Sequence, residues 1–227
     1  MLIALMTRIP EPGFTKTRLE THLTKEECAQ LHSAFIKDII TILEKAPVNY
    51  QIFYDIHGNR NRLQTIIPRH KLLVPQVGHT LGEKMLNAML WGFNKGYEKV
   101  AVLGTDIPSI DIDTIVKADS LLNHHDVVVG PTGDGGYYLL GMKNLYKDIF
   151  QIKNWGDATV LERTIANIDH LGLSWVFISQ HQDIDNFDDL KKLWQELEQG
   201  QLKNTPINTY KLLKSLNIEQ RITRLGR

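Results

Sequence analysis

The sequence has little of several features that mark particular classes of protein. It contains one cysteine, Cys28, which excludes an internal disulfide and is typical of a reducing compartment. Its 26 Lys and Arg residues equal its 26 Asp and Glu residues, so no net charge would draw it onto nucleic acid or a membrane surface. The apolar stretch Leu2–Met6 is too short for a signal peptide, and no apolar run approaches the roughly 20 residues that cross a bilayer. We therefore expect a soluble, cytoplasmic protein that binds no nucleic acid and does not insert stably into membranes.

Several common catalytic and nucleotide-binding motifs are also missing. The chain has no HExxH, no Gly-x-Ser-x-Gly and no cysteine–histidine zinc spacing, which argues against the common hydrolases. It has neither a Walker loop nor a Gly-x-Gly-x-x-Gly dinucleotide fingerprint. A phosphate group would therefore have to be bound without a glycine-rich cradle.

Strand-like and helix-like patterns alternate along the 227 residues. Short apolar runs are separated by segments of helical periodicity, the first of which opens with the capping-box pair Thr24 and Glu27. Repeated strand–helix units with short connections predict a layered α/β fold with helices on both faces of a sheet. The expected strands are Leu2–Met6, Tyr50–Tyr54, Lys71–Pro75, Lys99–Leu103, Val127–Val129, Tyr137–Met142 and Trp175–Ser179; the expected helices are Thr24–Ala46, Arg60–Ile67, Leu81–Asn94, Ile112–Leu122, Ala158–Leu171 and Asp188–Glu198.

The chain shows no internal repeat and no flexible linker, so residues 1–200 are expected to form one domain. Residues 201–227 differ in charge, because they carry six Lys or Arg residues against a single acid, Glu219. We expect this segment to be a basic helical extension that packs on the domain or on a second subunit, which would make a homodimer. The six cations are at positions 203, 211, 214, 221, 224 and 227.

The segment "RIPEPGFTKTRL" directly follows the first expected strand and carries the cations Arg8, Lys16 and Arg18. In open α/β sheets, ligands bind beyond the carboxyl ends of the strands. Cations at that edge can bind a diphosphate through charge-assisted hydrogen bonds. The loop by itself is equally consistent with a diphosphate site and with solvated surface cations.

Asp106, in "VLGTDIPSI", follows the strand Lys99–Leu103 and should lie at the same edge of the sheet. A carboxylate near bound phosphates suits Mg²⁺ or Mn²⁺, which need only one or two carboxylates from the protein. Capping of the Ile107–Pro108 turn is the alternative, and the neighbouring basic loop favours the metal.

Three weaker signals lie later in the chain. The glycine-rich segment "GPTGDGG" holds Asp134, which would accept hydrogen bonds from a sugar, act as a base or simply form a hairpin turn. Asp183 and Asp185 precede a helix; helix capping is favoured for Asp183, whereas Asp185 is equally suited to capping and to metal binding. Trp155 is either a core residue or a platform for stacking a sugar.

Taken in order, these motifs resemble a family of bacterial proteins of the glycosyltransferase-A, or nucleotide-diphospho-sugar transferase, superfamily. Some members are labelled glycosyltransferases, including ones near arsenosugar biosynthesis genes. The resemblance runs in register over roughly residues 2–190. The matching segments are "RIPEPGFTKTRL", "LGEKM" (Leu81–Met85), "LGTDIPSI", "DVVVGPTGDGGYYLLGM" (Asp126–Met142) and "DIDNFDDL".

The resemblance implies a glycosyltransferase-A-like fold with a mostly parallel, mixed sheet and helices on both faces. It also implies a metal-dependent glycosyltransferase that uses Mg²⁺ or Mn²⁺ to move a sugar from a nucleotide-sugar to a small-molecule acceptor. The implied metal ligands are Asp106 and Asp185, and the catalytic residues are Asp106, Lys16 and Asp134, with Asp157 as another candidate base. The implied nucleotide- and phosphate-binding residues are Arg8, Gly13, Lys16, Arg18, Gly82, Glu83 and Thr105, and the acceptor side would include Gly135, Gly136, Tyr137 and Trp155.

The chain departs from the family pattern at three places. It has Asn186 where threonine is usual, His79-Thr80 where Gly-Asp is usual, and Gly156-Asp157 where Ser-Thr is usual, and the last two bear on the choice of acceptor. "PEPGFTKTRL" also resembles the start of phospholactate guanylyltransferases, so a nucleotidyltransferase that releases pyrophosphate is an alternative. A nucleotide-sugar-binding protein without catalysis is a second alternative.

Overall fold

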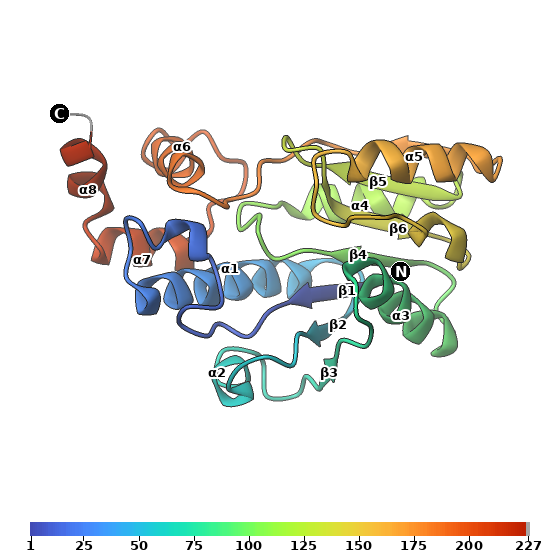
Figure 1. Ribbon diagram of the computed structural model, residues 1–227, viewed down its shortest axis with the longest axis horizontal. Helices are drawn as coiled ribbons and strands as arrows, with labels where there is room; N and C mark the ends of the chain where they lie inside the picture. The colour runs from blue at the N-terminus through green and yellow to red at the C-terminus, as the bar shows by residue number, and fades with distance from the viewer. Residues whose placement is uncertain (226–227) are drawn as a thin grey trace.

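Seven strands form one sheet in the order β3-β2-β1-β4-β6-β5-β7 in the computed structural model, which describes residues 1–225 (Figure 1). Strand β6 runs antiparallel to its neighbours β4 and β5, and the other pairings are parallel. The mostly parallel, mixed sheet predicted from the sequence is therefore confirmed. The strands are β1 Leu2–Thr7, β2 Asn49–Tyr54, β3 Leu73–Pro75, β4 Val100–Leu103, β5 Val127–Pro131, β6 Tyr137–Met142 and β7 Trp175–Phe177.

Helices cover both faces of this sheet. Helices α1 (Lys25–Lys45), α2 (Arg60–Gln64) and α4 (Ile112–Leu121) pack on one face, where Ile3 and Leu5 of β1 join their core. Helices α3 (Leu81–Asn94) and α5 (Val160–His170) pack on the other face, where Leu2 and Ala4 point. The alternation of side chains along a strand thus gives β1 two apolar faces, as expected of a central parallel strand.

The start of α1 follows from the sequence. The Thr24 hydroxyl accepts a hydrogen bond from the Glu27 backbone N–H, and the Glu27 carboxylate accepts one from the Thr24 backbone N–H. This reciprocal cap satisfies two backbone donors that the helix leaves free. Cys28 is fully buried on the inner face of α1.

The remaining helices pack at one end of the molecule (Figure 1): α6 (Phe187–Glu198), α7 (Ile207–Ser215) and α8 (Ile218–Leu225). The buried carboxylate of Asp38 on α1 accepts hydrogen bonds from the backbone N–H groups and side chains of Asn208 and Thr209, which ties α7 to α1. Arg221 pairs with Glu27, with Nη2 2.6 Å from Oε1. The basic segment is thus helical, with a break at Asn217, whose φ is 49°.

Arg227, one of the six cations of that segment, lies outside the described residues. Two short 3₁₀ helices, η1 (Thr17–Leu19) and η2 (Lys147–Phe150), complete the elements. Over residues 1–225, none of the helices combines the length and the apolar character needed to cross a membrane.

Candidate active site

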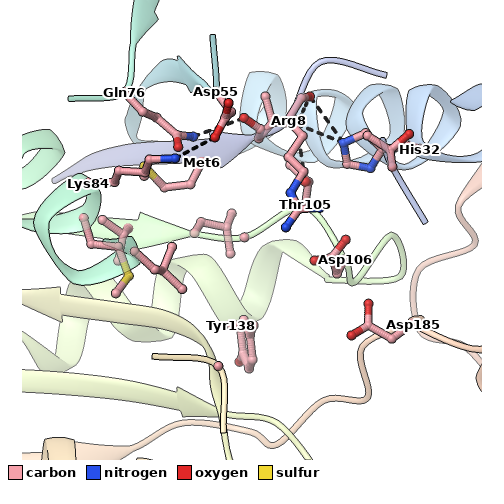
Figure 2. A pocket seen from close by; sticks show the side chains of 18 of the residues that line it. Met6, Arg8, His32, Asp55, Gln76, Lys84, Thr105, Asp106, Tyr138 and Asp185 are labelled. Carbon is pink, nitrogen blue, oxygen red and sulfur yellow. Dashed lines mark hydrogen bonds and ion pairs between the residues drawn. The ribbon is translucent and has the colours of Figure 1, made fainter. Parts of the chain in front are cut away.

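A cleft of about 690 Å³ opens at the carboxyl ends of β1 and β4 (Figure 2). One side of it is cationic and acidic, and the other is apolar apart from Asp55, Gln76 and Lys84. The charged side comprises Arg8, Lys16, Arg18, Asp106 and Asp185, and the apolar side comprises Met6, Leu81, Met85, Val102, Tyr137 and Trp155. This is the sheet edge at which open α/β sheets bind ligands.

Lys16 points from the loop after β1 into the charged side of this cleft. Its Nζ lies 2.5 Å from Asp106 Oδ1 and 3.1 Å from Asp185 Oδ1, and it donates a hydrogen bond to the Ile184 carbonyl at 2.6 Å. The Lys16 side chain is only 4% exposed, and its backbone has a left-handed φ of 52°. That conformation disfavours residues other than glycine, so the surrounding structure must hold it in place.

The ion pairs set the charge states of the cluster. Burial lowers the pKa of Lys16, but the nearby carboxylates of Asp106 and Asp185 raise it by more than burial lowers it. The net shift of the pKa is therefore upward. Desolvation raises the pKa of Asp106, but the Lys16 ammonium, with smaller contributions from His32 and Arg8, lowers it overall. The lysine is therefore an ammonium and Asp106 a carboxylate at neutral pH.

Asp185 reaches the cleft because the segment before α6 is tied to the loop that follows β4. The Ile184 backbone N–H donates to the Asp106 carbonyl at 2.9 Å. Helix α6 is capped by Asn186 and Asp189, and the Asp189 carboxylate also accepts from the Asp185 backbone N–H at 3.1 Å. The capping role expected for Asp183 is therefore wrong, because Asn186 fills it.

Asn186 stands where the family usually has threonine, and both residue types are good helix N-caps. The departure from the family pattern at this position therefore leaves the placement of Asp185 intact.

The other cations predicted from the loop are more exposed. Arg18 is 75% exposed, and its Nη1 lies 3.5 Å from Asp185 Oδ2. Arg8 is exposed and lines the cleft, while Gly13, at φ 78°, forms the turn of the loop and does not line it. Thr105 is buried in the cleft floor, where its hydroxyl lies 3.4 Å from that of Thr7.

Several residues predicted as nucleotide- or acceptor-binding have structural roles away from the cleft. Glu83 completes a capping box with Thr80 at the start of α3. Asp134 accepts hydrogen bonds from the Thr132 hydroxyl and the Gly136 backbone N–H in the β5–β6 turn. Gly135 packs against the Ala158 carbonyl. None of Glu83, Asp134, Gly135 and Gly136 lines the cleft.

Two aromatic residues predicted on the acceptor side do line the cleft, namely Tyr137 and Trp155. The buried Tyr137 hydroxyl has no hydrogen-bond partner within the described part of the chain. Trp155 lies against Gly82 in the first turn of α3, where a side chain would collide with the indole. Gly82 therefore does not line the cleft itself, but its lack of a side chain leaves room for Trp155 there. Asp157 is outside the cleft and binds Thr159 and Arg163.

The structure adds His32 to the cleft, a residue not predicted from the sequence. His32 is 4% exposed on α1, and its Nε2 lies 3.3 Å from the Thr7 hydroxyl and 3.3 Å from the Arg8 carbonyl (Figure 2). Burial lowers its pKa to about 4, so the imidazole is neutral at pH 7. It holds the backbone at the start of the cationic loop. Its position on the apolar face of α1 gave no sign of this role.

Asp55, Gln76 and Lys84 also line the cleft without having been predicted. Lys84 Nζ lies 2.6 Å from Asp55 Oδ2, and the Gln76 amide donates to the carbonyls of Thr7 and Phe53. Asp55 and Gln76 directly follow β2 and β3. The rule that located Asp106, a polar residue just beyond a strand, would have found both.

The two carboxylates of Asp106 and Asp185 converge on one point, the position of Lys16 Nζ. Within residues 1–225, no three or more His, Cys, Asp or Glu side chains are grouped so as to hold a metal ion. Two carboxylates are nevertheless sufficient for Mg²⁺ or Mn²⁺ when phosphate oxygens and water complete the coordination shell. The donor set therefore fits such an ion in the presence of a bound diphosphate.

Comparison with known proteins supports the fold and the family. Residues 28–157, more than half of the chain, match the model of a family described as an uncharacterized protein conserved in bacteria (DUF2064). No protein in the curated set matches this sequence.

Solved structures with the same fold include a provisionally assigned nucleotide-diphospho-sugar transferase from Desulfovibrio desulfuricans G20. It is 29% identical, with a TM-score of 0.87, over 96% of this chain and 95% of that one. A cytidylyltransferase from Leptospira borgpetersenii serovar Hardjo-bovis is 12% identical, with a TM-score of 0.55, over 95% and 94%. A manganese complex of Rv0371C from Mycobacterium tuberculosis H37Rv is 11% identical, with a TM-score of 0.50, over 86% and 98%. The last two likenesses show a shared fold.

Proposed function

Because this chain belongs to the bacterial DUF2064 family and has the fold of a nucleotide-diphospho-sugar transferase, we propose that it is a metal-dependent glycosyltransferase. It would move a sugar from a nucleotide-diphospho-sugar to a small-molecule acceptor. One observation carries this proposal: Lys16, Asp106 and Asp185 meet in a cleft at the carboxyl ends of the strands.

In such a transfer, the bond between the anomeric carbon and the diphosphate oxygen breaks, and negative charge builds up on the leaving diphosphate. Lys16 and Arg18 supply fixed positive charge beside it, with Arg8 at the same edge. Charge that is in place before the reaction stabilises the transition state without a cost of reorganisation. The cationic loop therefore replaces the missing glycine cradle.

Asp106 and Asp185 would hold Mg²⁺ or Mn²⁺, and such an ion would add positive charge to the same diphosphate oxygens. The manganese complex of a protein with the same fold is consistent with this choice of ion. Before a ligand binds, Lys16 holds the two carboxylates together, and His32 contacts the carbonyl of Arg8. These residues act on the donor half of the substrate.

The acceptor would lie on the apolar side of the cleft, against Tyr137 and Trp155. The exposed face of an indole ring is a common platform for a sugar or another flat apolar group. Asp134 was predicted to be a catalytic base, but its carboxylate closes the β5–β6 turn, so its position gives that role no support. We retain Tyr137 and Trp155 as the acceptor-side residues and place Gly135 and Gly136 behind them as turn residues.

A second candidate is a nucleotidyltransferase, favoured by the cytidylyltransferase that shares this fold over 95% of the chain. The same cations would then stabilise a leaving pyrophosphate. The products separate the two reactions, because a glycosyltransferase releases a nucleoside diphosphate and a nucleotidyltransferase releases pyrophosphate. A protein that only binds nucleotide-sugars would release neither.

The test is a thermal-shift screen of UDP, GDP, CDP and ADP and of their sugar conjugates, with and without Mn²⁺. A ligand that binds the folded state alone raises the melting temperature, and the stabilisation grows with the logarithm of its concentration over its Kd. We expect Asp106→Asn to remove the metal-dependent shift and Asp188→Asn, an exposed carboxylate on α6, to retain it. Equal, metal-insensitive shifts in wild type and Asp106→Asn would contradict the proposal.

A further inference from the structure

Lys16 occupies the position at which the two acidic residues of the cleft converge. An ammonium group has three N–H donors and no acceptor. Here the three have three oxygen partners: Asp106 Oδ1 at 2.5 Å, Ile184 O at 2.6 Å and Asp185 Oδ1 at 3.1 Å. With its side chain 4% exposed, Lys16 is a complete, buried counter-ion for the pair.

We propose that Lys16 excludes a free divalent cation from Asp106 and Asp185, so that the metal enters only together with the diphosphate of the nucleotide. This inference rests on the proposed function, because it assigns an order of binding to the same site. Lys16 thereby acts as a positioning residue with two alternative partners.

The geometry gives the reason. A Mg²⁺ ion bound to both carboxylates would lie about 2.0–2.1 Å from their oxygens, in the space that the ammonium group now fills. Two cations at such separation repel each other strongly in a partly desolvated cleft. The ion can therefore bind only when Lys16 Nζ moves to another anion.

A diphosphate supplies that anion. Its oxygens would accept the hydrogen bonds that Lys16 Nζ now donates to the two carboxylates, and they would also complete the coordination of the ion. Arg18 supports the exchange, because its Nη1 lies 3.5 Å from the other Asp185 oxygen and can turn toward the phosphate at the same time. Binding of one diphosphate would thus move both Lys16 and Arg18 from the carboxylates to phosphate oxygens and leave the carboxylates to the metal ion.

The left-handed backbone of Lys16 favours this exchange. A residue at φ 52° is held by its surroundings, and the strong ion pairs with two carboxylates contribute to that hold. Transfer of the Lys16 ammonium to a phosphate would remove that contribution, while His32 still holds the backbone of Arg8. The same loop thus senses the nucleotide and admits the metal.

The test measures Mn²⁺ binding without any turnover, by electron paramagnetic resonance of free Mn²⁺. In the wild type we expect weak binding of Mn²⁺ alone and at least tenfold tighter binding when UDP or GDP is present, after correction for chelation by the nucleotide. In Lys16→Met, which has a similar length and no charge, we expect at least tenfold tighter binding of Mn²⁺ alone than in the wild type.

Two variants serve as controls. Lys84→Met removes a second partly buried, ion-paired lysine from the same cleft, one that contacts Asp55, and should bind Mn²⁺ alone as weakly as the wild type. In the double variant Lys16→Met with Asp185→Asn, the binding gained by Lys16→Met should be lost. If Lys16→Met does not fold, Lys16→Gln, which is also uncharged but keeps polar groups for the Ile184 carbonyl and the carboxylates, is measured in its place, with the same expected gain in binding of Mn²⁺ alone.

The outcomes separate this inference from the proposed function. Tight binding of Mn²⁺ alone to the wild type, unchanged by UDP or GDP, would overturn the exclusion by Lys16 and leave the metal-dependent transferase standing. Failure of the wild type to bind UDP, GDP or their sugar conjugates under any condition would instead overturn the proposed function.

Discussion

The indole of Trp155 lies against Gly82, such that a Cβ atom on Gly82 would be 2.4 Å from Cε2 and Cζ2 of the ring. At such a separation the indole would have to shift, so glycine in the first turn of α3 allows Trp155 to stay at the cleft. Gly82, which was assigned to the nucleotide from the sequence, thus shapes the side of the cleft that we propose for the acceptor.

Replacing Gly82 with alanine should displace Trp155. We expect Gly82→Ala to lower the free energy of unfolding by about 1–3 kcal/mol, the usual cost of overpacking, even though alanine favours helix. The acceptor KM should rise while the affinity for the metal–nucleotide complex stays unchanged. Urea denaturation measures the loss of stability, nucleotide titration measures the affinity, and initial rates at varied acceptor concentration measure the KM.

A double-mutant cycle with Trp155→Ala provides the control. Without the indole, the added methyl group has nothing to displace, so Gly82→Ala should cost little in the Trp155→Ala background. Additive losses of stability from the two changes would show that the contact between these residues is not the cause.

The sequence could predict those site residues that follow a strand. Lys16 and Asp106 follow β1 and β4, which are adjacent and parallel, so their meeting required only that both strands be recognised. Asp185 lies 79 residues beyond Asp106, and the backbone hydrogen bond between Ile184 and Asp106 places it in the cleft. No local pattern predicts such a long-range contact, and only the family resemblance implied that Asp106 and Asp185 act together.

Local patterns could not predict the role of a residue whose type suits two different roles. Aspartate in a glycine-rich turn suits a base and a turn equally, and in Asp134 the turn prevailed. His32 lies on the apolar face of α1, where histidine is normally a core residue. Only the fold shows that this face meets the start of the cationic loop.

The stability of the protein should depend on pH through His32. Burial lowers its pKa from 6.5 to about 4, so between these values the unfolded chain takes up a proton that the folded chain does not. Stability is then fully present above pH 6.5 and is lost as the pH falls toward 4, by about 3 kcal/mol in total. We expect His32→Gln, which stays neutral and can still donate to the Arg8 carbonyl, to show a smaller loss.

Urea denaturation at several pH values between 4 and 7 measures this difference. The matched control is His124→Gln, which removes an exposed histidine at the end of α4 and should leave the pH dependence of the wild type intact. The same slope in wild type and His32→Gln would mean that the imidazole is protonated in the folded protein over this range.

Arg18 should matter for ligand binding and hardly at all for stability. Its side chain is 75% exposed, and its contact with Asp185 is 3.5 Å long, so the pair contributes about 0–1 kcal/mol to folding. A charge-assisted hydrogen bond to phosphate is stronger, about 1.5 kcal/mol or more, which corresponds to roughly tenfold in affinity.

We therefore expect Arg18→Ala to keep the melting temperature of the wild type and to bind UDP or GDP with Mn²⁺ about tenfold more weakly, as measured by calorimetry. The difference should shrink at high salt, because an exposed charge is screened. Arg163→Ala removes an arginine of intermediate exposure that pairs with Asp157 outside the cleft, and should leave affinity unchanged. If the two variants bound nucleotide equally well, Arg18 would be an ordinary solvated arginine, and the diphosphate would have to be held by Lys16, Arg8 and the metal alone.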